Sequence, residues 1–363
     1  MSLEPPSQPP DERRSDSYRY ELPQELIAQH PAERRDESRL LVLDGDRIDH
    51  ARFRDLPEYL RANDVLVLNE TRVIAARLFG TRESSGGRVE LLLLHPASSA
   101  RYDATAVRWI ALARPARRLR VGEGVRFEPS GRAVVVAELD DGAREVAFDL
   151  DEPFAQFLER AGRLPLPPYV HEDSAGNRER YQTVFARVPG SVAAPTASLH
   201  FTPELLTQIE ALGVSLARIV LDVGLGTFRP MTAERIDGHR MHAETYEVPA
   251  AAAGAIAAAR NRGGRIIAAG TTVVRALESA AGEDGSVATG EGSTSLFITP
   301  GYRFRIVDAL ITNFHLPRSS LLVLVSAFAG RDRILGAYAR AVRERYRFFS
   351  FGDAMFVVRE GST

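Results

Sequence analysis

Cysteine is absent from the sequence, which excludes disulfide bonds, thiolate nucleophiles, cysteine-ligated zinc and iron–sulfur clusters. Lysine is absent as well, so all 46 residues of the combined lysine and arginine count are arginine. This second absence excludes Schiff-base chemistry, a pyridoxal-phosphate anchor and the lysine of a P-loop. The side chains left for catalysis are those of His, Asp, Glu, Tyr, Ser, Thr and Arg.

Long apolar runs are also missing, because none reaches the ~18 residues that would cross a bilayer. The first 17 residues are polar, proline-rich and charged, and they lack the apolar stretch of a signal peptide. We therefore expect residues 1–17 to form a disordered tail. We also expect a cytoplasmic protein without a membrane segment, and a monomer.

Charge is nearly balanced, with a formal net charge of −2, but arginine is unevenly distributed. Six arginines fall in residues 331–347 and five in residues 114–126. Clusters of this kind are either solvated faces or surfaces that contact phosphate. The net charge by itself does not indicate a nucleic-acid-binding protein.

The pattern of apolar segments predicts an α/β fold interrupted by a small β-barrel. Brief Leu/Val runs alternate with helical segments in residues 18–71 and 161–363, which we assign to one α/β domain carrying the active site. Short alternating segments separated by Gly, Ser, Pro and Asp fill residues 72–160 and predict an inserted β-barrel domain. A chain of 363 residues is long enough for two such domains.

Three predicted strands of the α/β domain end in polar loops, where ligands bind in open α/β sheets. The strand over 217–223 leads into GLGTF, the strand over 265–269 into Gly270, and the strand over 308–312 into Asn313 and His315. Each feature alone has an ordinary explanation, as a turn, a helix cap or a buried structural histidine. Together they favour a ligand site, although GLGTF lacks the G-x-G-x-x-G pattern of a dinucleotide site.

Two further segments carry histidine. PTASLHFTPELL places His200 between two large apolar side chains, just before a helix that begins at Pro203. HRMHAETY carries His239 and His242, followed by Glu244. The second segment is either a metal site on one helical face or a polar loop that delivers His242 and Glu244 to a substrate. It shows neither an H-E-x-x-H pattern nor a third ligand.

A set of motifs runs along almost the whole chain after the tail. They are RDESRLLVLD (35–44), LVLNETRVIAARLFG (66–80), ERYQTVFA (179–186), APTASLHFT (194–202), VGLGTFRPM (223–231), MHAETY (241–246), AAGTTVVRALE (268–278), residues 300–328 with NFHLP, and YRFFSFGDAMF (346–356). Together these motifs resemble the S-adenosylmethionine:tRNA ribosyltransferase-isomerases of queuosine synthesis.

The resemblance implies an α/β domain interrupted by a β-barrel, in agreement with the pattern of apolar segments. It also implies that the ribosyl group of S-adenosylmethionine is transferred and isomerised onto 7-aminomethyl-7-deazaguanine at the tRNA wobble position. Epoxyqueuosine forms, and adenine and methionine are released. S-adenosylmethionine is then a donor substrate, the macromolecular partner is the tRNA anticodon stem–loop, and no metal or other cofactor is expected.

The implied reaction needs a general base, because the sulfonium acidifies the neighbouring ribose C5′ proton. Histidine suits a base near neutral pH. The candidates are His200, His242 and His315, since each lies inside a family motif. We expect one imidazole to remove the C5′ proton and another to protonate the departing adenine, and the sequence does not assign which.

Other motif residues are candidates for binding the substrates. A carboxylate or an aromatic face suits the sulfonium, a helix start or an arginine suits the methionine carboxylate, and an aromatic ring with an amide suits the flipped-out base. The candidates for contact with the sulfonium are Asp222, Glu244 and Phe228. Those for the methionine carboxylate are Gly270, Thr271, Thr272 and Arg275, and those for the flipped-out base are Tyr181 and Gln182. Asp353 is a candidate contact of a ribose or of the base amine, and Thr196, Gly226, Thr227 and Asn313 complete the set.

Several of these candidates have structural alternatives. Arg275 is alternatively a surface residue of its helix, Tyr181 a core aromatic and Asp353 the cap of a turn. Two positions also depart from the family pattern: Ser198 stands where glycine is common, and Asp222 where histidine is common. Asp222 leaves open a transferase of the same fold with another acceptor. A third interpretation is a noncatalytic RNA-binding protein whose loops are only structural.

Overall fold

The computed structural model describes residues 11–97, 102–139, 142–167, 169–170, 174–224, 231 and 233–359. The chain divides into two compact units. The first, which we call the α/β unit, consists of Met1–Asn69, Thr196–Ile219 and Gly226–Thr363. The second, the barrel unit, consists of Glu70–Pro195 and Val220–Leu225.

The predicted tail, residues 1–17, differs from expectation over its last residues. Residues 1–10 lie outside the described part of the chain, whereas Ser15–Tyr18 form a 3-10 helix, η1, in which Ser15 and Tyr18 are buried. The backbone N–H of Ser15 donates to the carbonyl of Glu234 at 2.8 Å, and the Tyr18 hydroxyl donates to that of Glu12 at 2.9 Å. These contacts explain why a polar segment is ordered here.

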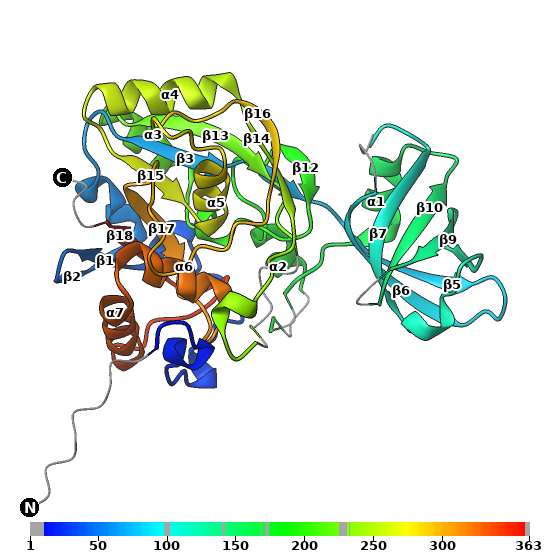
Figure 1. Ribbon diagram of the computed structural model, residues 1–363. Helices are drawn as coiled ribbons and strands as arrows, with labels where there is room; N and C mark the ends of the chain where they lie inside the picture. The colour runs from blue at the N-terminus through cyan, green and yellow to red at the C-terminus, as the bar shows by residue number, and fades with distance from the viewer. Residues whose placement is uncertain are drawn as a thin grey trace, which may run out of the picture. The chain divides into compact units, whose positions relative to one another are not determined.

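Among the described residues, nine strands form the large sheet, in the order β16-β14-β13-β3-β15-β17-β18-β1-β2 (Figure 1). Their bounds are β1 Arg39–Asp44, β2 Arg47–Arg52, β3 Val65–Asn69, β13 Ser215–Leu221, β14 Glu244–Val248, β15 Ile266–Ala269, β16 Gly290–Thr294, β17 Ala309–Asn313 and β18 Ala354–Val358. β13, β3, β15 and β17 are parallel, so their carboxyl ends share one edge, which we call the carboxyl edge. β18 runs antiparallel to β17, and β1 runs parallel to β18, so the first residue of β1 lies at this same edge.

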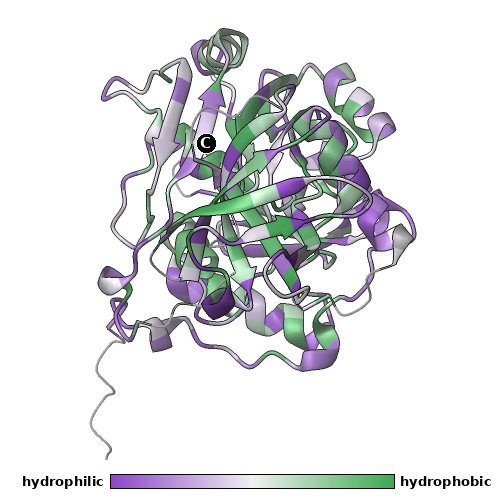
Figure 2. Ribbon diagram, turned by 90° about the vertical axis from the view of Figure 1, so that its right-hand side faces the viewer, coloured by the Kyte–Doolittle hydropathy of each residue, from purple (hydrophilic) through white to green (hydrophobic). Residues whose placement is uncertain are grey.

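The central strands are buried along their whole length, as expected where helices cover a parallel sheet. The helices of the α/β unit are α3 Pro203–Ala211, α4 Ala250–Asn261, α5 Thr271–Ser279, α6 Ser320–Ala329 and α7 Arg331–Arg343. Shorter 3-10 helices are η2 Gln24–Leu26, η3 Arg35–Glu37, η4 Phe53–Tyr59, η7 Thr196–Ser198 and η9 Ile236–Gly238. Figure 2 shows hydrophobic residues along many of the strands. No helix in the described part of the chain is both long and apolar enough to cross a membrane.

The barrel unit contains a closed antiparallel sheet. The strand order is β11-β5-β6-β7-β10-β9-β8, and an additional pairing of β5 with β8 closes the barrel. The bounds are β5 Arg77–Arg82, β6 Arg88–Pro96, β7 Ala106–Arg114, β8 Gly124–Arg126, β9 Arg132–Glu138, β10 Ala143–Asp149 and β11 Gly162–Arg163. The unit also holds α1 Phe154–Ala161, α2 Ala175–Arg180, η5 Ala116–Arg118 and the parallel pair β4 Thr71–Val73 with β12 Val188–Ser191.

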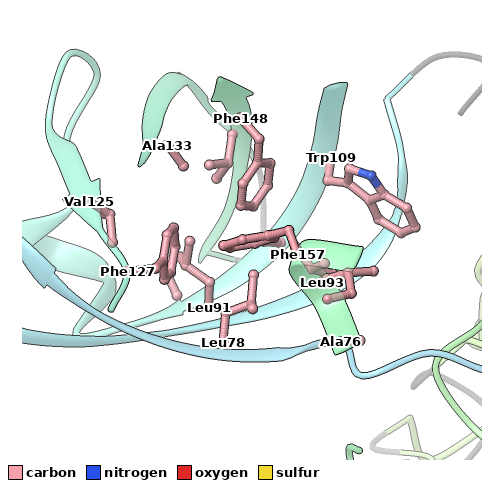
Figure 3. Packing of buried hydrophobic residues seen from close by; sticks show 14 of the residues in the cluster. Ala76, Leu78, Leu91, Leu93, Trp109, Val125, Phe127, Ala133, Phe148 and Phe157 are labelled. Carbon is pink, nitrogen blue, oxygen red and sulfur yellow. The ribbon is translucent and has the colours of Figure 1, made fainter. Parts of the chain in front are cut away.

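Alternate residues of the barrel strands point inward and form a separate hydrophobic core. Figure 3 shows Leu78 and Leu91 from neighbouring strands directed toward Phe127, Phe148 and Phe157. The Phe127 and Phe157 rings meet edge to face, with centroids 5.3 Å apart. The prediction of an α/β fold with a small β-barrel is thus confirmed. The predicted insertion, residues 72–160, falls inside the barrel unit, which continues to Pro195.

A buried ion pair joins the amino ends of β3 and β15. Asp64 is fully buried, and its carboxylate accepts hydrogen bonds from Arg265 Nη2 at 2.6 Å and from the Arg265 backbone N–H at 2.9 Å. The backbone N–H of Arg61 donates to the same carboxylate at 2.9 Å. Because both charged side chains are desolvated, removing one charge would leave the other buried and unpaired.

Replacing Asp64 with Ala should therefore lower the free energy of unfolding by about 3–5 kcal/mol. The matched control is Asp49→Ala, because the guanidinium partner of Asp49, Arg47, is 77% exposed. That exposed pair should contribute less than about 1 kcal/mol. Equilibrium urea unfolding measures both changes, and equal losses would contradict the importance given to the buried pair.

Candidate active site

His200 is held between two side chains at the carboxyl edge. Its Nδ1 lies 2.7 Å from Ser38 Oγ and its Nε2 lies 3.3 Å from Asn313 Oδ1. The ring stacks on Phe53 with centroids 4.9 Å apart, and the side chain is buried. Both ring nitrogens are thus occupied by the protein itself.

The amide of Asn313 fixes which nitrogen of His200 carries the proton. Asn313 Nδ2 donates to the carbonyls of Phe349 at 2.8 Å and Ser350 at 3.2 Å, so Oδ1 faces the ring as an acceptor. His200 Nε2 must therefore be the N–H donor, and Nδ1 accepts from the Ser38 hydroxyl. Burial lowers the pKa of His200 to about 4, partly opposed by the negative charge of Asp353. The ring is neutral at neutral pH.

His315, two residues past Asn313, is held differently. Its Nε2 lies 2.8 Å from Thr312 Oγ1, while its Nδ1 makes no hydrogen bond within the described part of the chain. The backbone is clamped on both sides: its N–H donates to the Tyr338 hydroxyl at 3.0 Å, and its carbonyl accepts from the Tyr20 hydroxyl. Burial lowers the pKa of His315 to about 3, so this ring is also neutral and has one nitrogen available to a ligand.

The start of α5 adjoins this region at the same edge. Gly270 precedes the helix with φ of 106°, which favours glycine, and its N–H donates to the carbonyl of Ile311 at 2.8 Å. A Cβ built on Gly270 would lie 3.6 Å from both Ala197 Cβ and Thr272 Oγ1, so η7 and the helix start face each other. The N-cap position of α5 is Gly270 rather than a threonine, and Thr272 lies within the first turn.

Two buried hydroxyls at this junction have no hydrogen-bond partner among the described residues. They are Ser198 Oγ and Thr272 Oγ1. Thr271 is also buried, and Thr196, which is half-buried, accepts from the Leu199 N–H through its carbonyl at 3.1 Å. An unsatisfied buried hydroxyl costs about 1–3 kcal/mol, so these two hydroxyls are candidate contacts for a ligand.

Arg275 and Glu244 are not placed as substrate contacts. They form a buried ion pair, and Arg275 Nε also donates to the carbonyl of Leu296 at 3.0 Å. The assignment of Arg275 to a substrate carboxylate and of Glu244 to the sulfonium therefore finds no support, because the two charges satisfy each other. The alternative of a surface position for Arg275 is wrong, since its side chain is 2% exposed.

Asp353 serves as the cap of a turn. One carboxylate oxygen accepts from the Arg39 N–H at 3.0 Å, and the other accepts from the Arg347 N–H at 2.8 Å. Arg347 Nη2 adds a contact at 3.3 Å. The side chain is buried, and these bonds use both of its oxygens. The structural alternative raised for this residue accordingly accounts for its position.

His242 is exposed, in contrast to His200 and His315. His239 is half-buried against Phe297, with ring centroids 5.1 Å apart, and burial together with the nearby His242 lowers its pKa. The described residues contain no group of three or more His, Cys, Asp or Glu side chains placed to hold a metal ion. Glu244, the nearest carboxylate in the sequence motif, is engaged by Arg275.

Three predicted substrate contacts belong to the barrel unit. Tyr181 is fully buried, as its core alternative requires. The Gln182 side chain pairs with the backbone of Val73, accepting at 3.1 Å and donating at 2.7 Å, which uses its amide for structure. Asp222 accepts from Thr71 Oγ1 at 3.0 Å, and any side chain at Gly190 would collide with its carboxylate. Gly226, Thr227 and Phe228 lie outside the described residues.

The arginine cluster of residues 331–347 is partly committed to the protein. Arg331 Nε donates to the carbonyl of Ser17 at 2.7 Å, and Arg347 pairs with Asp353. Arg340, Arg343 and Arg345 are exposed. A cavity of about 190 Å³ lies at the opposite edge of the sheet, and its lining includes Tyr59, Arg61 and Arg265 but none of the predicted site residues.

Four residues of the site were not predicted from sequence. Ser38 and Thr312 orient the two imidazoles, and Tyr338 and Tyr20 hold the backbone of His315. Ser38, Tyr338 and Tyr20 act across separations that no local pattern reveals. Ser38 is 162 positions from His200. Thr312 alone had a local signal, because it ends the strand that leads to His315.

The fold and the site define a class: an α/β protein, interrupted by a barrel, that gathers neutral imidazoles and buried hydroxyls at the carboxyl edge of its sheet. Residues 15–357 match the family model described as queuosine biosynthesis protein. Two similar relatives are named S-adenosylmethionine:tRNA ribosyltransferase-isomerase. The one from Symbiobacterium thermophilum is 54% identical, over 95% of this chain and 100% of its own length. The one from Gloeobacter violaceus is 53% identical, over 96% of this chain and 98% of its own length.

A solved structure is also similar. The S-adenosylmethionine tRNA ribosyltransferase from Thermotoga maritima is 37% identical, with a TM-score of 0.53, over 94% of this chain and all of that one (100%). The chain therefore belongs to the queuosine biosynthesis family, which confirms the resemblance seen in its motifs.

The lowered pKa values of His200 and His315 predict how stability depends on pH. Between pH about 6.5 and the folded pKa values of about 4 and about 3, the unfolded state binds more protons than the folded state. The contribution of the two rings to the free energy of unfolding should be fully present above pH about 6.5 and should fall as the pH drops. Each ring should contribute up to ~1.4 kcal/mol per pH unit to this fall. His315→Gln should remove one of these two contributions to the slope. Urea unfolding at a series of pH values measures it, and an unchanged slope would show that His315 titrates normally.

Proposed function

We propose that this protein transfers and isomerises the ribosyl group of S-adenosylmethionine onto 7-aminomethyl-7-deazaguanine at the wobble position of tRNA. The products are epoxyqueuosine in the RNA, free adenine and methionine. Family membership supports this reaction, as do the names of relatives that match nearly the whole chain. The observation that carries the proposal is the free nitrogen of His315 at an edge that also presents two unpartnered buried hydroxyls. Because the proposed substrate is a tRNA, we expect the activity to lie in the cytoplasm.

His315 is the base that removes the ribose C5′ proton. The Thr312 hydroxyl donates to the carbonyl of Asn313 at 3.5 Å, so its oxygen can accept from His315 Nε2. In that tautomer the neutral ring has a lone pair on Nδ1. A pKa of about 3 makes the imidazole a weak base, so the sulfonium must supply much of the acidity of C5′. The same low pKa makes the protonated ring a strong acid, suited to hand the proton on to departing adenine.

His200 is a positioning residue. Both of its nitrogens are bonded within the protein, so it has no lone pair for substrate and no free N–H to give. Its bonds tie Ser38, before β1, to Asn313, at the end of β17. This fixes the strand end from which His315 projects.

Ser198 and Thr272 bind the methionine part of the donor. Both hydroxyls are buried without partners, and Thr272 lies in the first turn of α5, where free N–H groups favour a carboxylate. The donor is a substrate of the reaction. Positioning of the donor and electrostatic stabilisation of developing charge contribute to the rate enhancement.

The reaction is tested with S-adenosylmethionine and anticodon stem–loop RNAs that carry either the deazaguanine or plain guanine. We expect adenine to appear only with the modified RNA, as measured by chromatography. Adenine release with a different acceptor would instead support a related transferase, the possibility raised by Asp222. RNA binding without any adenine release would identify a noncatalytic binding protein.

Replacing His315 with Gln should lower the rate of adenine release at saturating substrates by about 100-fold or more, because a general base contributes 10²–10⁴-fold. Gln keeps a donor toward Thr312, so the fold should survive, which circular dichroism verifies. His242→Ala is the matched control and should react at nearly the rate of the unmodified protein, since this exposed ring has no part in the proposed site. The reverse order of activities would assign catalysis to His242.

Thr272→Val tests the donor site by deleting one hydroxyl at nearly constant volume. We expect the KM for S-adenosylmethionine to rise about tenfold with kcat little changed, the result for a contact equally strong in ground and transition states. Because the hydroxyl has no partner in the free protein, its loss should not reduce the stability of that protein.

The control for this substitution is Thr202→Val. The Thr202 hydroxyl caps α3 by accepting from the Leu205 N–H at 3.1 Å, so this change should cost about 1 kcal/mol of stability and leave KM unaltered. A destabilised Thr272→Val variant with normal KM would contradict the donor assignment.

A further inference from the structure

A large aromatic side chain stands exposed on the outer face of the barrel. Phe79, on β5, is 45% exposed, whereas the adjacent Leu78 is fully buried in the barrel core. Strand alternation places Arg77 and Thr81 on the same outer face as Phe79. A phenylalanine that is 45% exposed leaves much of its ring in solvent, so its surroundings decide whether it has another role.

Two guanidinium groups flank the ring. Arg163 Cζ lies 5.1 Å and Arg77 Cζ 5.8 Å from the centroid of Phe79, both within the range of cation–π attraction. Arg163 is exposed and makes no ion pair within the described residues. Arg77 pairs with Glu90, which lies opposite Phe79 on β6, at 2.6 Å.

The strand register extends this basic surface across the barrel wall. Thr81 on β5 pairs with Arg88 on β6 and with Arg126 on β8, while Glu90 pairs with Arg114 on β7. These neighbours share the outer face, because their inward alternates belong to the barrel core. We define the Phe79 face as Arg77, Phe79, Arg88, Arg114, Arg126 and Arg163. β5, β6 and β7 can be followed in Figure 1.

The Phe79 face carries an excess of positive charge around one aromatic ring. Glu90 pairs with Arg77, and Glu83 pairs with both Arg126 and Arg132, each at 2.9 Å. Arg88, Arg114 and Arg163 are exposed and have no carboxylate partner in the described part of the chain. The apolar surface here is a single ring among guanidinium groups rather than a contiguous patch, so it does not resemble a hydrophobic protein interface.

We propose that the Phe79 face binds single-stranded RNA, with one unpaired base stacked on Phe79 and phosphates held by Arg88, Arg114 and Arg163. Every base offers a π-face to an exposed aromatic, and arginine contributes both charge and cation–π attraction. The inference rests on the proposed function in one respect, since that function requires an RNA substrate. It adds a second contact region, on the barrel, which recognises RNA without reading its sequence.

The test compares Phe79→Ala with Val121→Ala, a control that truncates another exposed hydrophobic side chain of the barrel unit, 59% exposed. We expect Phe79→Ala to weaken binding of the anticodon stem–loop RNA about tenfold, and Val121→Ala to leave it unchanged. Arg163→Ala should reduce the slope of log affinity against log salt by about 0.7, the value for one contact to single-stranded RNA. Binding is measured by fluorescence anisotropy of labelled RNA, which is independent of catalysis.

A second variant reports stacking directly. Phe79→Trp adds an exposed indole to a protein whose single tryptophan, Trp109, is fully buried. Its fluorescence should be quenched as RNA is added and protected from iodide by bound RNA. Normal RNA affinity of Phe79→Ala, or an indole that RNA does not quench, would overturn the proposal even if the unmodified protein releases adenine. Concentration-dependent self-association that Phe79→Ala abolishes would assign the face to a second copy of the chain, and would also overturn it.

The two hypotheses fail in distinguishable ways. If the unmodified protein releases no adenine but Phe79→Trp is quenched by RNA, the reaction is wrong and the RNA face stands. If the rate of adenine release depends on RNA concentration in the same way for Phe79→Ala and for the unmodified protein, the proposed reaction stands and the proposed RNA face is wrong.

Discussion

The hydrogen-bonded chain from Ser38 through His200 to Asn313 is the interaction on which the candidate site depends. It joins the residue before β1 to the end of β17, and Asn313 extends it to the carbonyls of Phe349 and Ser350 in the turn before β18. Because the amide orientation fixes the imidazole tautomer, each member of the chain has a defined donor and acceptor role. A neutral, fully bonded ring in this place costs less than a charged one would, which is why burial depresses its pKa.

The hydrogen bonds distinguish two histidines that are equivalent candidates in the sequence. Both ring nitrogens of His200 are hydrogen-bonded to residues at strand ends, whereas His315 is bonded through Nε2 and its Nδ1 remains available. The two tyrosines that bond the N–H and the carbonyl of His315 hold its backbone in place. A fixed imidazole with one available nitrogen is the arrangement that the proposed general-base role requires.

Much of the fold follows from local signals in the sequence. Pro203 begins α3, Thr202 caps it and Gly213 follows it with a positive φ, and the alanine-rich segment forms α4. The convergence of strand ends at one edge also follows, because parallel strands share their carboxyl ends. The resemblance to a known family then supplied the reaction, which no local pattern contains.

The sequence could not reveal which polar residues are already satisfied. Arg275 meets Glu244 from 31 positions away, and Gln182 meets Val73 from 109 positions away. A carboxylate or amide within a motif is equally compatible with a substrate contact and with a buried structural bond, and only the three-dimensional partner decides. The ordered segment Ser15–Tyr18 has the same cause, since Glu234 lies 219 positions from Ser15.

The most direct test of the account is a crystal structure of the protein with S-adenosylmethionine bound. We expect the ribose C5′ to lie about 3.5 Å from His315 Nδ1, the separation of a reactive conformer, and the methionine carboxylate to reach Thr272 and Ser198. We also expect His200 to keep its bonds to Ser38 and Asn313. A donor bound beside His242, or in the cavity at the opposite edge lined by Tyr59 and Arg61, would contradict it.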